Sequence, residues 1–398
     1  MTRRMEMGAL DHLKDELATL EADGLLLHPR TLSGPTGARA TFDGHEVINL
    51  ASNNYLGLAN HSRMNRAAAD AAASLGAGSG AVRTIAGQMD LHRVLERRFA
   101  AFKHADAALM FQSGFTANAG TVAAILGKDD VIVSDRLNHA SIIDGARLSR
   151  AQIAVFEHRD VEDADRKLVE TKREGSRQLL ITDGVFSMDG DIAPLPDLVE
   201  VAERHGAIMM IDDAHATGVL GTRGAGTVDH FGLQGRVDIQ VGTLSKAIGV
   251  LGGFIAGPPH LIEWLQNRGR PYLFSTSAPP SVVAACIEAL DIIGDEPDRL
   301  ERLWSNTAFL KKGLHALGFD TGDSETPITP VVTGDEEKTQ VFARRIFEEG
   351  VFCPAIVFPT VARGKARVRT IVTADHTEAD LGEALAVFER VGKELGLL

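Results

Sequence analysis

The sequence is poor in cysteine, in aromatic side chains and in basic charge. Its 398 residues include two cysteines, Cys286 and Cys353, which lack the paired spacing of a zinc site and cannot form a disulfide framework. Aromatic residues make up only 5%, so we expect a core built mainly from Ala, Val, Leu and Ile. The net charge is −13, which disfavours a grip on nucleic-acid phosphates. These shortages predict a cytoplasmic protein without a nucleic-acid partner.

Long apolar segments and several common catalytic motifs are also missing. The uncharged stretch from Ala107 to Gly127 is interrupted by polar side chains, and charged residues from Asp11 onward interrupt the N-terminal segment. We therefore expect neither a membrane partner nor a secretion signal. The chain has no P-loop, no G-x-S-x-G elbow and no HExxH motif. Gly76, Gly78 and Ala81 match a relaxed dinucleotide fingerprint, but they follow a helical pattern, which favours a loop.

Glycine is abundant, with 40 residues, and many glycines follow short apolar segments between about residues 105 and 257. These segments alternate with helical patterns, and each is apolar throughout. Continuous apolarity is typical of strands covered on both faces, so the pattern predicts an α/β fold with a mainly parallel, seven-stranded sheet and helices on both faces. The segments are AALMF, VIVSD, IAVFEH, QLLITD, AIMMIDD, IQVGT and GGFIAG.

The two ends of the chain have different patterns. Four leucines lie on one face of a helix predicted for the first two dozen residues, which must pack against the body or another subunit; they are Leu10, Leu13, Leu17 and Leu20. Residues 280–320 read as helical. Beyond Thr326 we expect a strand (ITPVVTG), a helix over 336–349, two strands (VFCPAIVFP and ARVRTIV) and a last helix opened by Thr377. We predict an N-terminal segment over 1–60, a large domain over 61–290 and a small α/β domain over 291–398.

Candidate site residues follow the predicted strands, where open α/β sheets bind ligands. After AALMF, Gly114 and Phe115 begin a helix whose free N–H groups suit a phosphate, although a plain strand-to-helix turn explains them too. His139 follows VIVSD at a helix start, where a mere capping neighbour is the alternative. Ser187 lies in a glycine-flanked loop after QLLITD.

Two further strand ends carry charged groups. Asp212, Asp213 and His215 follow AIMMI, and adjacent buried acids need a cation or a protonated nitrogen nearby. A metal ion is one alternative at this position. Lys246 follows IQVGT among small and apolar residues, so desolvation should lower its pKa and favour a neutral amine that can form a Schiff base.

In this order the pieces resemble the fold-type-I enzymes that use pyridoxal 5′-phosphate (PLP). More narrowly, the sequence resembles the α-oxoamine synthase family over essentially its whole length. The motifs that carry the resemblance are NLASNNYLGLANH, GSGAVRTIAG, LNHASIIDGARL, TDGVFSMDGDIAPL, DDAHATGVLG, GTLSKAIG, RPYLFSTS and KARVRTIVTADHT. The family joins a small amino acid to an acyl-CoA and releases CoA.

The resemblance implies a role in cofactor binding or catalysis for each candidate. Lys246 would bind the cofactor covalently and then act as the base, and Asp212 would pair with the pyridine nitrogen. His139 would stack on the ring and orient the substrate. The remaining cofactor contacts implied are Ser187 and His215 at the phenolic oxygen, and Gly114, Phe115 and Thr243 at the phosphate.

The resemblance also implies a homodimer with shared sites. Ser275 and Thr276 would reach the phosphate bound in the neighbouring subunit. Arg369 would hold the substrate carboxylate as a bidentate fork, and Asn53 would face the substrate. No metal is implied.

Within the family the motifs look most similar to those of glycine C-acetyltransferases, so acetyl-CoA and glycine are the expected substrates. Gln88 replaces a usual Thr, and Ser113-Gly114 replaces a usual Ser-Cys. A decarboxylating 8-amino-7-oxononanoate synthase, which uses alanine and pimeloyl-CoA, and a synthase of relaxed specificity are the alternatives. An aminotransferase of the same fold and a non-catalytic scaffold are the alternatives from other classes.

Overall fold

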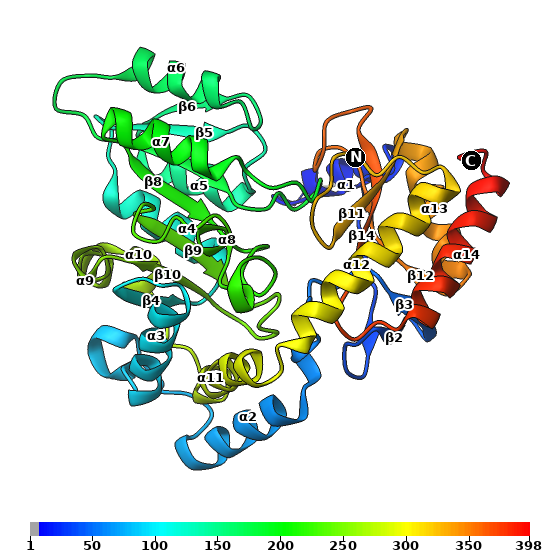
Figure 1. Ribbon diagram of the computed structural model, residues 1–398, viewed down its shortest axis with the longest axis horizontal. Helices are drawn as coiled ribbons and strands as arrows, with labels where there is room; N and C mark the ends of the chain where they lie inside the picture. Colours follow the sequence, from blue (N-terminus) through cyan, green and yellow to red (C-terminus); the bar gives the residue numbers. More distant parts are fainter. Residues whose placement is uncertain (1–7) are drawn as a thin grey trace, which may run out of the picture.

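A computed structural model describes residues 8–398 and places the seven predicted strands in one sheet (Figure 1). The strand order is β4-β10-β9-β8-β7-β5-β6, and only β10 runs antiparallel to its neighbours. The predicted mainly parallel α/β fold is confirmed. The strands are β4 (Ala107–Phe111), β5 (Val131–Asp135), β6 (Gln152–Phe156), β7 (Gln178–Asp183), β8 (Ile208–Asp212), β9 (Ile239–Thr243) and β10 (Gly253–Gly257).

Helices cover both faces of this sheet because successive strand residues point to opposite sides. Leu179 and Ile181 of β7 pack with α4 (Gly114–Ile125), α5 (Ala140–Ser149) and α9 (Pro259–Arg268). Leu180, between them, packs with the helices of the other face, α6 (Val161–Thr171) and α7 (Leu195–His205). The remaining helices of this part are α2 (Ser62–Leu75), α3 (Asp90–Phe102), α8 (Thr227–His230), α10 (Arg270–Phe274) and α11 (Pro280–Asp295).

The two ends of the chain share a second, four-stranded sheet of order β1-β2-β3-β12. Val351 of β12 pairs in parallel with Ile48 of β3, which joins the N-terminal segment to the C-terminal part. A three-stranded sheet of order β11-β14-β13 lies beside it, on the opposite side of the molecule from the large sheet (Figure 1). The strands are β1 (Leu32–Ser33), β2 (Arg39–Phe42), β3 (His45–Asn49), β11 (Ile328–Gly334), β12 (Val351–Phe352), β13 (Ala355–Ile356) and β14 (Ala366–Ile371).

One sequence prediction for the C-terminal part is corrected. The segment VFCPAIVFP is not one strand: Pro354 has no N–H to donate, and β12 and β13 on either side of it belong to different sheets. The helical stretch 280–320 is two helices, α11 and α12 (Asp298–Leu317), separated at Glu296 and Pro297. Helices α13 (Glu336–Glu348) and α14 (Glu378–Glu394) are as predicted, and Thr377 caps α14. The domain boundaries at 60 and 290 stay a prediction.

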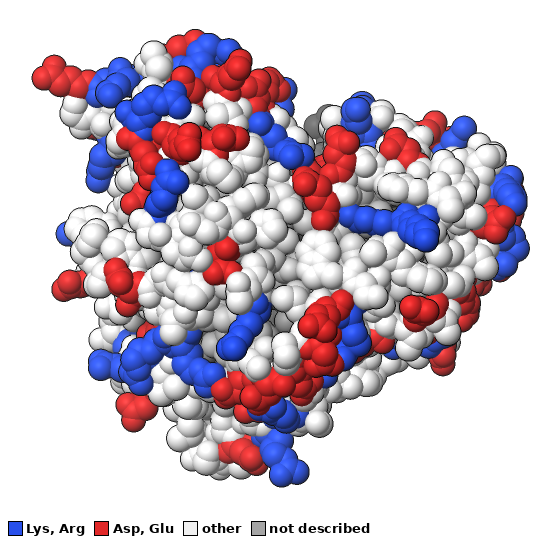
Figure 2. Space-filling view, viewed as in Figure 1, with Lys and Arg blue, Asp and Glu red and all other residues white. Residues whose placement is uncertain are grey.

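The N-terminal helix forms as α1 (His12–Ala22), but none of its residues is buried by the described part of the chain, so its leucine stripe is exposed there. The side chains of Leu10 and Leu17 are 71% and 51% exposed. The leucine stripe was predicted to pack against the body of the protein or against another subunit. Packing against another subunit stays a prediction. The first seven residues, which belong to the predicted 1–60 segment, lie outside the described part. Between residues 8 and 398 no helix combines the length and the apolarity needed to cross a membrane. Acidic and basic side chains are interspersed on the face shown in Figure 2.

Candidate active site

A cavity of about 250 Å³ lies at the carboxyl ends of the parallel strands. Seven predicted site residues line it: Gly114, Phe115, His139, Asp212, His215, Thr243 and Lys246. Six more lining residues were not predicted as site residues: Ser113, Ser141, Asp183, Val185, Ala214 and Ser245. Within the described chain, five predicted residues do not line this cavity: Asn53, Ser187, Ser275, Thr276 and Arg369.

The turn before α4 is shaped to receive an anion. The Ser113 hydroxyl accepts a hydrogen bond from the Thr116 N–H at 3.0 Å, and the Thr116 hydroxyl accepts one from the Ser113 N–H at 2.9 Å. This capping box leaves the N–H groups of Gly114 and Phe115, in the first turn, without an intrahelical acceptor. A Cβ atom on Gly253 would collide with the backbone of Ser113 and Gly114, so this glycine lets the turn pack on the sheet. The geometry fits a phosphate group.

Asp212 ends β8 as a buried carboxylate with only neutral hydrogen-bond donors. Its Oδ2 accepts from Asn118 Nδ2 at 2.6 Å and its Oδ1 from the Ala214 N–H at 2.8 Å. Such a group attracts a protonated nitrogen. Sequence reasoning missed Asn118; the signal was a single amide inside an otherwise apolar helix. A cation was expected near the two adjacent acids. It is Lys103, whose Nζ lies 2.7 Å from Asp213 Oδ2, so it pairs with Asp213.

Lys246 follows β9 and lines the same cavity. Burial lowers the pKa of its amine, although the charges of Asp212 and Asp183 act in the opposite direction. The predicted direction of this pKa shift is confirmed. Burial and the nearby Asp212 also raise the pKa of the Asp183 carboxyl. Its Oδ1 is buried with no hydrogen-bond partner among the described residues, while its Oδ2 accepts from the His139 N–H at 3.2 Å.

Each of the two cavity histidines has its Nδ1 within hydrogen-bond distance of a neighbouring group. His139 caps α5, and its Nδ1 accepts from the Ser141 N–H at 3.2 Å, which leaves the ring proton on Nε2. His215 Nδ1 lies 2.7 Å from the Tyr55 hydroxyl, the natural donor to it. Burial lowers the pKa of both imidazoles, and Lys246 contributes to each shift. Tyr55 was missed by sequence reasoning, because its contact with His215 joins residues 160 positions apart.

Arg369 and Asn53 carry buried polar atoms that lack partners within the described chain: Arg369 Nε and Asn53 Oδ1. One end of the Arg369 guanidinium is committed, since Nη1 donates to the Ser187 carbonyl at 3.0 Å. The free Nε fits a carboxylate, which accepts from a guanidinium edge. The Ser187 carbonyl thus contacts Arg369, and the residue lines a neighbouring cavity of about 670 Å³.

Ser275 and Thr276 lie on a surface segment away from the cavity. The Thr276 carbonyl accepts from Gln112 Nε2 at 3.1 Å, and its backbone forms a bridge with Val82. Their contact with a neighbouring subunit stays a prediction. Gln88 is also outside the cavity, and its Oε1 accepts from Arg83 Nε at 2.7 Å.

The donor set of the cavity fits PLP. It offers an anion-binding turn, a carboxylate for a protonated ring nitrogen and a desolvated lysine. Among residues 8–398, no group of three or more His, Cys, Asp or Glu side chains is arranged so that it could hold a metal ion.

Comparisons with known proteins agree with this geometry. The family model "Aminotransferase class I and II" matches residues 45–388. The 8-amino-7-oxononanoate synthase of Symbiobacterium thermophilum is 58% identical over 98% of this chain and 100% of its own. The 8-amino-7-oxononanoate synthase 1 of Bacillus subtilis is 52% identical over 100% of both chains.

Solved structures of two related enzymes also match this chain over most of its length. The serine palmitoyltransferase of Sphingomonas wittichii is 31% identical over 99% of both chains, with a TM-score of 0.93. A serine palmitoyltransferase structure determined with PLP has the same identity and TM-score and covers 99% of this chain and 100% of that one. The 8-amino-7-oxononanoate synthase of Francisella tularensis is 25% identical, with a TM-score of 0.75, over 88% of this chain and 98% of that one.

Proposed function

Because the chain belongs to the PLP-dependent α-oxoamine synthases of the class I and II aminotransferase family, we propose that it is an 8-amino-7-oxononanoate synthase. The proposed reaction joins L-alanine to pimeloyl-CoA with loss of CoA and CO₂. The observation that carries the proposal is full-length identity of 58% and 52% to two such synthases.

The expectation of glycine and acetyl-CoA gains no support from these relatives. The family prediction is confirmed, but the relatives favour the decarboxylating alternative over glycine C-acetyltransferase. The two enzyme types share a reaction up to carbon–carbon bond formation, so motifs around the cofactor separate them poorly.

The residues around the cavity divide the work of holding the cofactor. Bound PLP supplies an electron sink for the charge that develops at the substrate α-carbon. Gly114 and Phe115 would donate N–H groups to its phosphate, joined by Thr243. Asp212 would pair with the protonated pyridine nitrogen, because only a positive partner compensates a buried carboxylate with neutral donors. His215, which lines the cavity, and Ser187, which lines the neighbouring one, would contact the phenolic oxygen. Ser275 and Thr276 of a second subunit would complete the phosphate site.

The substrate-facing residues act on the amino acid. Lys246 would hold the cofactor, and its amine would remove the α-proton; burial lowers the pKa of that amine, which favours its neutral form. Arg369 holds the carboxylate through the Nε edge that has no partner in the described chain. His139, with its proton on Nε2, flanks the ring, and Asn53 faces the substrate.

The test is a series of kcat/KM values for glycine and L-alanine, each with acetyl-, succinyl-, pimeloyl- and palmitoyl-CoA, followed by the product mass. Lys246→Ala is the inactive control. We expect L-alanine with pimeloyl-CoA to be preferred and the product to lack the carboxylate.

A preference for glycine and acetyl-CoA, with a product that keeps the carboxylate, would instead support glycine C-acetyltransferase activity. Amino transfer to a keto acid without thiol release would indicate an aminotransferase.

A further inference from the structure

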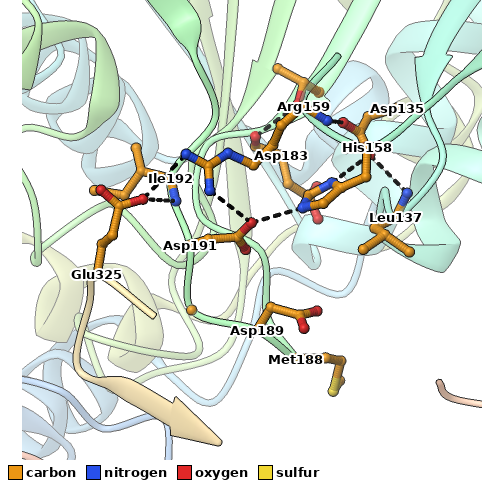
Figure 3. Close-up of polar contacts among 12 residues, drawn as sticks. Asp135, Leu137, His158, Arg159, Asp183, Met188, Asp189, Asp191, Ile192 and Glu325 are labelled. Atoms are coloured by element: carbon orange, nitrogen blue, oxygen red, sulfur yellow. Dashed lines mark hydrogen bonds and ion pairs between the residues drawn. The ribbon is translucent and has the colours of Figure 1, made fainter. Parts of the chain in front are cut away.

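His158 lies outside the cavity that holds Lys246, yet it joins two loops of the site (Figure 3). It follows β6, and its ring stands between two carboxylates. The distance from Nδ1 to Asp135 Oδ1 is 3.0 Å and that from Nε2 to Asp191 Oδ2 is 2.7 Å. The ring also meets Phe186 edge to face, with centroids 4.4 Å apart. Both carboxylates are buried, with side chains 1% and 6% exposed.

The two contacts define the charge on the ring. A carboxylate accepts hydrogen bonds, so a ring bonded to one through each nitrogen must carry a proton on both. His158 is therefore an imidazolium. The same two carboxylates raise the pKa of His158 to about 9, against the effect of burial.

Asp135 connects this cation to His139. Its Oδ1 also accepts from the Leu137 N–H at 2.8 Å, and its Oδ2 accepts from the Arg159 N–H at 2.9 Å. Its carbonyl accepts from the Asn138 N–H at 3.2 Å. Asp135 thus closes the turn 135–138, and the next residue is the cavity residue His139.

Asp191 connects the cation to Arg369. The loop 184–193 is closed by a bridge between Val185 and Ile192 and by a hydrogen bond from the Phe186 N–H to the Asp191 carbonyl at 3.1 Å. Within this loop, the Ser187 carbonyl accepts from Arg369 Nη1. A shift of Asp191 would therefore move the acceptor that orients the Arg369 guanidinium.

Other charged groups around the ring belong to the same network. Arg159 Nη1 lies 3.3 Å from Asp191 Oδ2, and its Nη2 lies 3.4 Å from Glu325 Oε1 (Figure 3). Glu325 Oε1 in turn accepts from the Ile192 N–H at 3.3 Å. Arg159 is a second cation for Asp191, but it does not bond the side chain of Asp135 through its guanidinium. His158 is the described side chain that bonds both carboxylates. Arg136, Asp189 and Arg367 line the cavity beside the ring.

We propose that His158 is a positioning residue: as a cation clamped between Asp135 and Asp191, it fixes the turn that leads to His139 against the loop whose Ser187 carbonyl orients Arg369. The catalytic consequence of this proposal rests on the proposed function, in which Arg369 binds the carboxylate of the amino-acid substrate. Its structural part does not depend on that function.

The first test compares His158→Gln with His205→Gln in the full-length, PLP-loaded enzyme. His205 Nε2 forms a similar contact, 2.7 Å from Asp165 Oδ1, in a pair that no site loop shares. Hydrogen exchange followed by mass spectrometry should show faster exchange in 135–142 and 184–193 for His158→Gln, by about fivefold or more, and unchanged exchange there for His205→Gln. Unchanged exchange in both segments of His158→Gln, or the same change in both variants, would overturn the proposal.

The kinetic test separates positioning from general damage. His158→Gln should raise the KM for L-alanine roughly tenfold while the KM for the acyl-CoA stays within about twofold. Equal increases in both KM values would count against the proposal. If no acyl-CoA is turned over by the wild type, the proposed function fails, and the exchange experiment still decides the structural claim.

A pH titration of the wild type keeps the proposal testable if His158→Gln does not fold. The methyl signal of Met188, inside loop 184–193, is assigned with Met188→Leu in protein carrying ¹³C-methyl methionine. Because the pKa of His158 is raised to about 9, the clamp is present below that pH and lost above it, so the signal should shift with a midpoint near 9. A signal that does not change between pH 8 and about 10 would contradict the proposal.

Discussion

Asp212 and Asp213 are neighbours in sequence and both are buried, but the protein treats their charges in opposite ways. Asp213 meets Lys103 Nζ at 2.7 Å, and the two side chains are 0% exposed. Its second oxygen accepts from the Thr227 hydroxyl at 2.6 Å. Asp212 receives only two neutral N–H donors and lines the cavity. One charge is neutralised within the chain, and the other is left for a ligand.

The two lysines show the same contrast. Lys103 also donates to the Ala225 carbonyl at 2.6 Å, whereas Lys246 has no ion-pair partner within 4 Å among the described residues. A Cβ atom on Gly226 would collide with Lys103 Nζ and Asp213 Oδ2, and its φ of 108° also demands glycine. The fold closes tightly over the Lys103–Asp213 pair, whereas Lys246 lines a cavity of about 250 Å³. The pair away from the cavity is therefore satisfied internally, and the two charged groups proposed to act on the cofactor are not paired within the described chain.

Removing the open lysine should have the largest effect on activity. Lys246→Ala should lower kcat by about 1,000-fold or more, because positioned acid–base groups contribute up to about 10⁴-fold and the covalent link to the cofactor is also lost. The folded state should keep its stability, since no ion pair is broken. Thiol release and chemical unfolding measure the two effects. Turnover of Lys246→Ala near the wild-type rate would show that Lys246 neither holds the cofactor nor removes the α-proton.

Breaking the closed pair should affect stability instead. Lys103→Met leaves Asp213 buried without its cation, which should cost about 3–5 kcal/mol of unfolding free energy in chemical denaturation.

Lys311→Met is the matched control for that variant. Burial lowers the pKa of Lys311 to about 8, and its Nζ donates to the Ser324 carbonyl at 2.7 Å rather than to a buried carboxylate. Its loss should cost less than about 1.5 kcal/mol. Equal losses of unfolding free energy for Lys103→Met and Lys311→Met would contradict the claim that pairing with a buried carboxylate sets the cost.

Arg369 should behave as an open group even though it bonds Ser187. Arg369→Ala should raise the KM for the amino acid about 10- to 150-fold, the range expected when a charge-assisted bond of about 1.5–3 kcal/mol is lost. Arg236→Ala, which breaks an exposed pair with Glu203, is the control and should leave that KM unchanged. A change confined to the KM for the acyl-CoA would show that Arg369 has been assigned to the wrong substrate.

Tyr55 should give the smallest effect, because it acts through His215. Tyr55→Phe removes the hydroxyl 2.7 Å from His215 Nδ1 and should lower kcat about two- to tenfold, in line with about 0.5–1.5 kcal/mol for one hydrogen bond. Tyr272→Phe, at the only other tyrosine, is the control and should leave kcat unchanged. A loss beyond about 100-fold for Tyr55→Phe would mean that the hydroxyl contacts reacting atoms itself.

Local sequence patterns predicted the large sheet because each buried strand is a short, continuously apolar segment that can be recognised from its own residues. They also placed Asp212, Lys246 and His139 together, since parallel strands end at one edge. They missed the pairing of β12 with β3, which joins Val351 to Ile48, 303 positions away. Tyr55 and Lys103 were missed for the same reason, because each contacts the strand ends only through folding. Asn118 carried a weak local signal, a single amide in an uncharged helix, but its partner Asp212 is distant in sequence. The choice between acetyl-CoA and a longer acyl-CoA stays a prediction, and the relatives favour the alternative that the sequence motifs ranked second.

The most direct test of the central claim is to fix the cofactor on the protein. The PLP-loaded enzyme is reduced with borohydride, digested and analysed by peptide mass spectrometry. We predict the reduced cofactor on Lys246, the lysine that lines the cavity, and none on the buried Lys103, which is paired with Asp213. Cofactor on another lysine, or an unmodified Lys246 after full loading, would contradict the account.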